Sequence, residues 1–178
     1  MRELLIGCGS RRVKQVEVNG RVGWDDLTTL DADPSCGPDV RWDLTEFPFP
    51  FAGDSFDEIH AYDVLEHTGS QGDYRFFFAQ FSDFWRLLKP NGLFCAIVPS
   101  LTSPWAWGDP SHTRCLPPTC LMYLDQAAYA ENIGKSPMSD FRGIYRGDFT
   151  TEFTKLDELN FVFVLRAVKP SRWVSPQN

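Results

Sequence analysis

Short apolar runs separated by turn-forming residues recur along this chain, and they predict a sheet of short strands. Nearly continuous apolar runs such as Leu93–Pro99 are typical of strands buried on both faces of a parallel sheet. The predicted strands cover residues 3–6, 27–34, 40–44, 56–62, 93–99, 142–150 and 160–168. Because few residues separate the last two strands, we expect them to form an antiparallel pair.

A helical spacing of apolar residues marks the segment from Asp73 to Leu88. Its apolar side chains recur every three or four positions, and Asp73 is a suitable N-cap. Lys89–Gly92 contains Pro and Gly, which end the helix. We expect a second helix near Pro118–Ala130.

The connection after the first predicted strand lacks a helical pattern. Residues Val16–Val22 alternate around Asn19-Gly20, which predicts a hairpin or an irregular loop where a doubly wound fold has its first crossover helix. We therefore expect an α/β, Rossmann-like, mostly parallel seven-stranded sheet, with the first crossover helix shortened or replaced by a hairpin. A chain of 178 residues predicts one domain, residues 1–178.

The amino-acid composition limits the kinds of binding partner that we expect for this protein. A net charge of −7 disfavours nucleic acid and anionic membranes. The five cysteines include no Cys-x-x-Cys pair, so we expect free thiols in a reducing cytoplasm and neither disulfides nor a metal. The sequence also shows no signal peptide and no apolar run of transmembrane length.

The candidate chemistry begins where the first strand ends in Gly7-Cys8-Gly9. Glycine permits positive φ and close approach of a ligand, and ligands of open α/β sheets bind at the carboxyl ends of the strands. Arg12 replaces the third glycine of the dinucleotide fingerprint, which argues against a nicotinamide cofactor. Asp31 ends the neighbouring strand, where a carboxylate can accept two hydrogen bonds from a ribose diol.

An ordered set of motifs over roughly residues 3–100 resembles class I S-adenosylmethionine-dependent methyltransferases. The set comprises Leu4–Gly9, Thr29–Pro34, Trp42-Asp43-Leu44, Phe47–Phe51, Asp54–Asp57, Asp63–His67 and Leu87–Leu93. The resemblance implies S-adenosyl-L-methionine as cofactor. It implies cofactor contacts from Gly7, Cys8, Gly9, Asp31, Ala32, Asp43, Leu44, Tyr62 and Asp63.

The acceptor side is expected after the fifth strand. Small bacterial and phage methyltransferases of unassigned substrate carry a Gly-Asp-Pro-x-His-x-Arg segment, and Gly108–Arg114 resembles it. His112 is the first candidate for a base or an acceptor contact, with a structural bond to Asp109 as the alternative. His67 is the second, with a core or capping role as the alternative. The candidate substrate contacts are Trp105, Trp107, Asp109 and Arg114.

The sequence predicts methyl transfer to a small molecule, sugar or base. The alternative is a non-catalytic module of the same fold that senses the cofactor or binds a partner. Because the chain lacks the N-terminal helices that often cover the substrate in this family, a homodimer that covers the open face is also expected.

Overall fold

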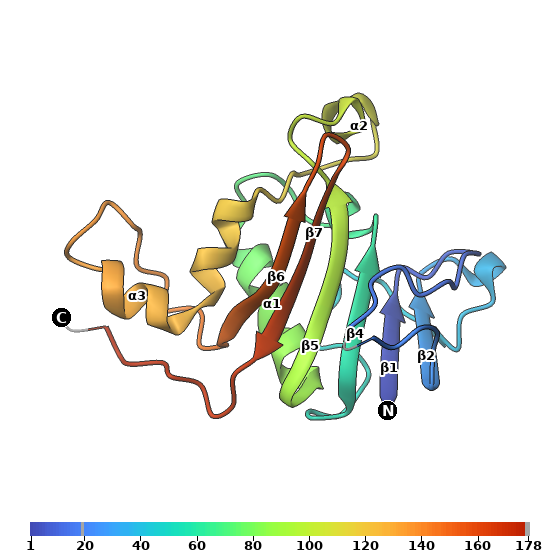
Figure 1. Cartoon of the computed structure of the whole chain (residues 1–178), viewed down its shortest axis with the longest axis horizontal. Helices are drawn as coiled ribbons and strands as arrows, with labels where there is room; N and C mark the ends of the chain where they lie inside the picture. Colours follow the sequence, from blue (N-terminus) through green and yellow to red (C-terminus); the bar gives the residue numbers. More distant parts are fainter. Residues whose placement is uncertain (19, 177–178) are drawn as a thin grey trace.

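The computed structural model describes residues 1–18 and 20–176, and its centre is a seven-stranded sheet of order β3-β2-β1-β4-β5-β7-β6 (Figure 1). Strands β1 to β5 are parallel, and β7 pairs antiparallel with both β5 and β6. This confirms the predicted Rossmann-like sheet and its C-terminal antiparallel pair. The strands are β1 (Arg2–Ile6), β2 (Asp26–Asp31), β3 (Val40–Arg41), β4 (Phe56–Tyr62), β5 (Leu88–Pro99), β6 (Phe149–Leu156) and β7 (Asn160–Ala167).

One face of the sheet is covered by helices, seen behind the strands in Figure 1. The principal one is α1 (Tyr74–Leu87), and the Asp73 carboxylate accepts from Phe76 N at its start, as the sequence predicts. Phe84 of α1 stacks on Phe94 of β5 with ring centroids 4.6 Å apart. The surplus of phenylalanine therefore fills the core between α1 and the sheet.

The remaining helices are short. They are the α-helices α2 (Pro104–Gly108) and α3 (Gln126–Asn132) and the 3-10 helices η1 (Pro34–Cys36), η2 (Leu65–His67) and η3 (Pro118–Leu124). The single helix expected over 118–130 is wrong, because Asp125 leaves helical geometry and its side chain caps α3 by accepting from Ala127 N. No helix in the described residues is long and apolar enough to span a bilayer.

The sixth strand was predicted too early. Residues 142–148 form a loop, and β6 begins at Phe149. The loop ends at Asp148, whose fully buried carboxylate accepts hydrogen bonds from Gln126 N and Arg172 N. The strand that follows is an edge strand with mostly exposed side chains, so it lacks the apolar signal that marks the buried strands.

The first crossover contains neither helix nor strand in residues 7–18 and 20–25, the part of this stretch that the structure describes. Of the two predicted alternatives, the described residues form the irregular loop and not the hairpin, and Asn19 of the predicted turn lies outside the described residues. The segment instead is anchored by polar contacts. Lys14 Nζ donates to Glu3 Oε1 at 2.6 Å and to Glu58 Oε2 at 2.7 Å, and Val16 N donates to the Tyr62 hydroxyl.

Candidate active site

The glycine turn after β1 opens toward the carboxyl end of the sheet. Gly7 and Gly9 have backbone φ angles of +58° and +48°, which residues other than glycine rarely adopt. A Cβ at Gly7 would lie 2.2 Å from Val64 Cγ2, so this position needs glycine for packing against the segment after β4. A Cβ at Gly9 would meet nothing within 4 Å, which leaves the Gly9 backbone facing open space.

The Asp31 carboxylate faces that turn. Its Oδ2 accepts from Gly9 N at 2.9 Å, and its Oδ1 accepts from Asp33 N at 2.9 Å. Parallel pairing of β1 with β2, with Ile6 opposite Leu30, places the two strand ends side by side. Each carboxylate oxygen has more than one lone pair, so these bonds leave acceptor capacity for a diol.

The residues predicted to approach the adenine lie beyond β3. Trp42 N donates to Asp31 O at 3.0 Å, which brings the Asp43 turn beside the end of β2. Asp43 Oδ1 accepts from Thr45 N at 2.8 Å, and Leu44 is buried in the core. Ala32 is exposed, while Cys8 is buried and its thiol pKa is raised by that burial. Their contacts with a cofactor stay predictions.

The end of β4 divides its two predicted cofactor residues between different environments. The Tyr62 hydroxyl lies 2.6 Å from His60 Nδ1 and also accepts from Val16 N, so it is already engaged in the buried network below the first crossover. Asp63 follows with φ of +50° and lines a cavity. Burial raises the pKa of the Asp63 carboxyl, and the nearby His67 and His112 partly offset that rise.

This cavity, of about 350 Å³, collects most of the predicted acceptor residues. Asp63, His67, Trp105, Asp109 and His112 all line it. The His67 and His112 rings are 4.6 Å apart and nearly perpendicular. His112 Nε2 lies 3.9 Å from Asp109 Oδ2, which is too long for the structural hydrogen bond considered as the alternative role of His112.

Glu66 also lines the cavity, and sequence reasoning did not select it. The residue is only 2% exposed, and burial raises the pKa of its carboxyl to about 7. Neither carboxylate oxygen has a hydrogen-bond partner among the described residues, and the same holds for His112 Nδ1. Buried carboxylates are rarely left unpaired, so this one indicates a functional residue. A linear sequence motif could not reveal it, because burial and pairing depend on the folded structure.

Two predicted substrate residues lie elsewhere. The Arg114 side chain is buried and donates to Leu65 O, Thr68 Oγ1 and Gln80 Oε1, so the structure makes it a tie between η2 and α1, and not a contact in this cavity. It borders a separate, mostly apolar cavity of about 210 Å³. Trp107 is 69% exposed and does not line the cavity of about 350 Å³ that His67 and His112 line, called the histidine cavity below. Trp105 does line it.

No protein-family model matches this sequence, and no curated protein sequence matches it significantly. Solved structures do match the fold. A SAM-dependent methyltransferase from Archaeoglobus fulgidus has a TM-score of 0.57 at 14% identity, covering 93% of this chain and 85% of that protein. One from Methanosarcina mazei has a TM-score of 0.56 at 14% identity, covering 94% and 92%.

The [4+2]-cyclase SpnF matches almost as well, with a TM-score of 0.55 at 12% identity over 94% of this chain and 74% of that enzyme. At such identities the likeness concerns the fold alone, and one fold hosts different chemistries. The chain therefore has the class I fold of S-adenosylmethionine-dependent methyltransferases.

Proposed function

We propose that this protein binds S-adenosyl-L-methionine and transfers its methyl group to a small-molecule, sugar or base acceptor. The observation that carries the proposal is the Asp31 carboxylate held 2.9 Å from Gly9 N at the open glycine turn. An adenosyl group would rest against the Gly7–Gly9 backbone, with its ribose hydroxyls donating to Asp31. The unobstructed space above Gly9 fits such a ligand.

The bound cofactor supplies a methyl group on a positively charged sulfur. The protein then has to align the acceptor and exclude water, because the sulfonium is already a good leaving group. Asp63 connects the predicted methionine end of the cofactor to the cavity that holds His67 and His112. An acceptor placed in that cavity lies beside two imidazoles, either of which can accept a proton from a hydroxyl or an amine.

Calorimetric titration with S-adenosylhomocysteine tests the cofactor half of this proposal. Replacing Asp31 by Asn keeps the shape and removes the charge that receives the ribose. Hydrogen bonds to charged groups are worth about 1.5–3 kcal/mol, so Asp31→Asn should weaken binding roughly 10- to 100-fold.

Asp33→Asn is the matched control. Asp33 lies two residues away, and its carboxylate binds Ser35 within its own turn, so the same charge loss should leave the affinity nearly unchanged. Equal weakening by both variants, or no binding by the unmodified protein at millimolar ligand, would contradict the proposal.

The second candidate is a non-catalytic module that senses the cofactor or binds a partner. The irregular loop that replaces the first crossover helix favours it, because that helix otherwise supports the glycine turn. The discriminating test supplies radiolabelled methyl donor and cell extract. Donor binding without transfer to any extract fraction would favour the module, whereas a labelled product would establish the enzyme.

A homodimer that covers the open face stays a further prediction. Partly or fully exposed apolar side chains lie on the sheet face opposite α1, called the helix-free face below, among them Val162 and Phe153. Light scattering that gives a monomer at high protein concentration would exclude it.

A further inference from the structure

Three potential metal ligands meet in the histidine cavity. Glu66, His67 and His112 each offer one ligand atom, and these three atoms all lie within 4.8 Å of one another. The Glu66 carboxylate and His112 Nδ1 are buried without a hydrogen-bond partner in the described part of the chain. We propose that Glu66, His67 and His112 bind a divalent transition-metal ion.

The donor set suits such an ion. Two imidazoles and one carboxylate leave coordination positions open, and this combination holds Fe²⁺ in oxygenases and Zn²⁺ in hydrolases. Metal–ligand bonds are about 2.0–2.2 Å long, so the three donors have to converge on one point. His67 is the exposed member, and its Nδ1 makes only long contacts of 3.2–3.3 Å with Ser111, so its ring is able to move inward.

The backbone holds the two contributing segments together. Thr113 N donates to Glu66 O at 2.9 Å, and Arg114 N donates to the same carbonyl oxygen at 3.3 Å. These bonds tie the two residues after His112 to η2, which carries Glu66 and His67. The ligands are thus placed by backbone bonds that do not involve their side chains, as a preorganised site requires.

No side-chain cation pairs with Glu66 in hydrogen-bond geometry among the described residues. The nearby Arg114 guanidinium donates instead to Thr68 and Gln80. A second cluster, Glu3, Glu58 and His60, shows the contrast. There Lys14 Nζ lies within 2.7 Å of both carboxylates and supplies the positive charge, so that cluster needs no ion.

The three ligands line the same 350 Å³ cavity, so an ion held by them would be accessible to an acceptor bound there. An acceptor oxygen bound there would lose its proton more readily, because a divalent ion lowers the pKa of a coordinated hydroxyl. The acceptor class is then an alcohol or phenol. This assignment of acceptor rests on the proposed methyl transfer, and it makes the two histidines ligands and not free bases.

The test titrates the full chain, labelled with ¹⁵N-histidine, with Zn²⁺ and follows the imidazole resonances. We expect those of His67 and His112 to shift and those of His60 to stay, with one ion bound per chain by calorimetry. Even indirect partners of metal ligands are worth about 10- to 100-fold in affinity. Glu66→Gln and His67→Gln should therefore each weaken binding at least about tenfold.

Glu17→Gln is the control, because it removes the same charge from an exposed site on the helix-free face. Glu66→Gln should fold, since it replaces an unpaired buried charge by a neutral group, and His67 is exposed. Unshifted His67 and His112 resonances, or equal affinity in all variants as the five free cysteines would produce, would overturn the proposal.

A titration of the same sample with S-adenosylhomocysteine separates the two proposals. Zn²⁺ binding at the histidines without S-adenosylhomocysteine binding keeps the metal site and removes methyl transfer. If S-adenosylhomocysteine binds but Zn²⁺ leaves the imidazole resonances unchanged, the metal site is refuted and the proposed function stands.

Discussion

The described part of the first crossover has no helix, and buried ion pairs of Lys14 anchor it to the sheet. Replacing Lys14 therefore tests how much these ion pairs stabilise the fold. The Lys14 ammonium lies between the buried carboxylates of Glu3 and Glu58, with salt-bridge distances of 2.6 and 2.7 Å. Burial lowers the pKa of the adjacent His60, which keeps that imidazole neutral at pH 7. Lys14→Met therefore leaves two facing carboxylates with no cation between them.

The expected loss is large because the pair is buried. Removing one partner of a buried ion pair costs about 3–5 kcal/mol, since the remaining charge keeps its desolvation penalty. For a chain of this length each kcal/mol corresponds to about 2–4 °C, so the melting temperature should fall by roughly 10 °C. The loosened segment would be residues 10–16, next to the glycine turn.

Thermal unfolding at two pH values measures this effect. In the unmodified protein, burial opposes ionisation of Glu58, but its bonds to His60 and Lys14 prevail and lower its pKa to about 2. The stabilisation is present above the ordinary glutamate pKa and is lost as pH falls toward 2. In Lys14→Met one carboxyl instead has a raised pKa, so the variant should gain stability from pH 8 to pH 5.

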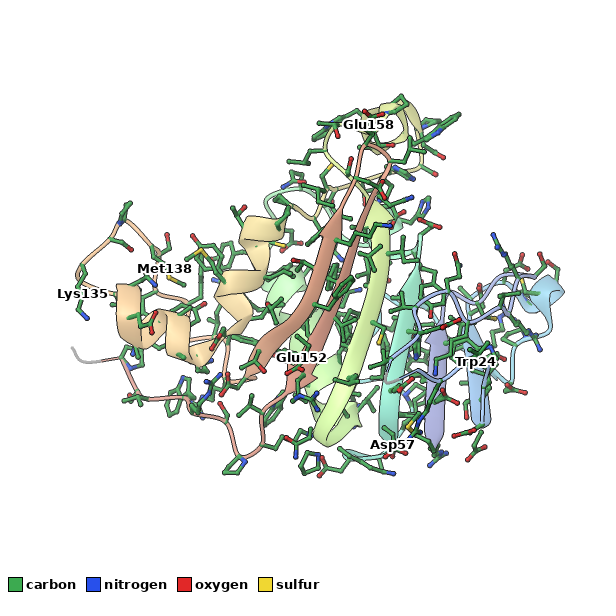
Figure 2. All side chains as sticks on the ribbon, in the orientation of Figure 1. Trp24, Asp57, Lys135, Met138, Glu152 and Glu158 are labelled. Carbon is green, nitrogen blue, oxygen red and sulfur yellow. The ribbon has the colours of Figure 1, made fainter. Side chains whose placement is uncertain are left out.

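Lys135→Met is the matched control, because Lys135 is exposed and lies far from Trp24 and the first crossover (Figure 2). Adding Glu3→Gln and Glu58→Gln to Lys14→Met removes both unbalanced carboxylate charges and should recover most of the loss. A fall below about 3 °C, or the same fall at both pH values, would show that the ammonium does not balance these carboxylates.

Three further changes are predicted to lower stability, each read by thermal or urea unfolding. Gly7→Ala places a methyl group against Val64 at a positive φ, so it should cost more than Gly9→Ala, whose penalty is the backbone term of about 1–2 kcal/mol; equal costs would contradict the clash. Asp73→Ala removes the cap of α1 and should cost about 1 kcal/mol, which Asp73→Asn should largely restore. Arg114→Met should cost at least about 1.5–3 kcal/mol by breaking charged hydrogen bonds that tie η2 to α1, and an unchanged unfolding midpoint would refute that role.

The buried strands could be predicted from the sequence, because a strand buried on both faces is a continuous run of apolar residues. β4 begins and ends where Phe56–Tyr62 predicted it, whereas β5 ends at Pro99 as predicted but begins at Leu88, five residues before the predicted strand. The edge strand β6 gave no such signal, and the sequence placed it several residues early. The first crossover was recognised as unusual, but its structure depends on Lys14 meeting carboxylates from two strands, which are contacts between distant residues.

The candidate site divides in the same way. Gly9 and Asp31 follow directly from the ends of adjacent parallel strands, so their approach was predictable. No sequence pattern selected Glu66 as a functional residue, because nothing in the local sequence shows that its carboxylate is buried without a hydrogen-bond partner. A search for cysteine spacing likewise could not detect the proposed ligand set, which is drawn from η2 and from the loop that contains His112.

The proposed reaction rests on both parts of the candidate site, because the fold alone is shared with a cyclase. In the proposed function, Gly9 and Asp31 would determine whether an adenosyl group binds, whereas Glu66, His67 and His112 would determine what is presented to it. Asp63 belongs to the same cavity as the second set and follows β4, the strand that pairs with β1. Because the sets share no residue, Asp31→Asn should leave Zn²⁺ binding intact, and Glu66→Gln should leave S-adenosylhomocysteine binding intact. Loss of both ligands in either variant would contradict the assignment of two separate sites.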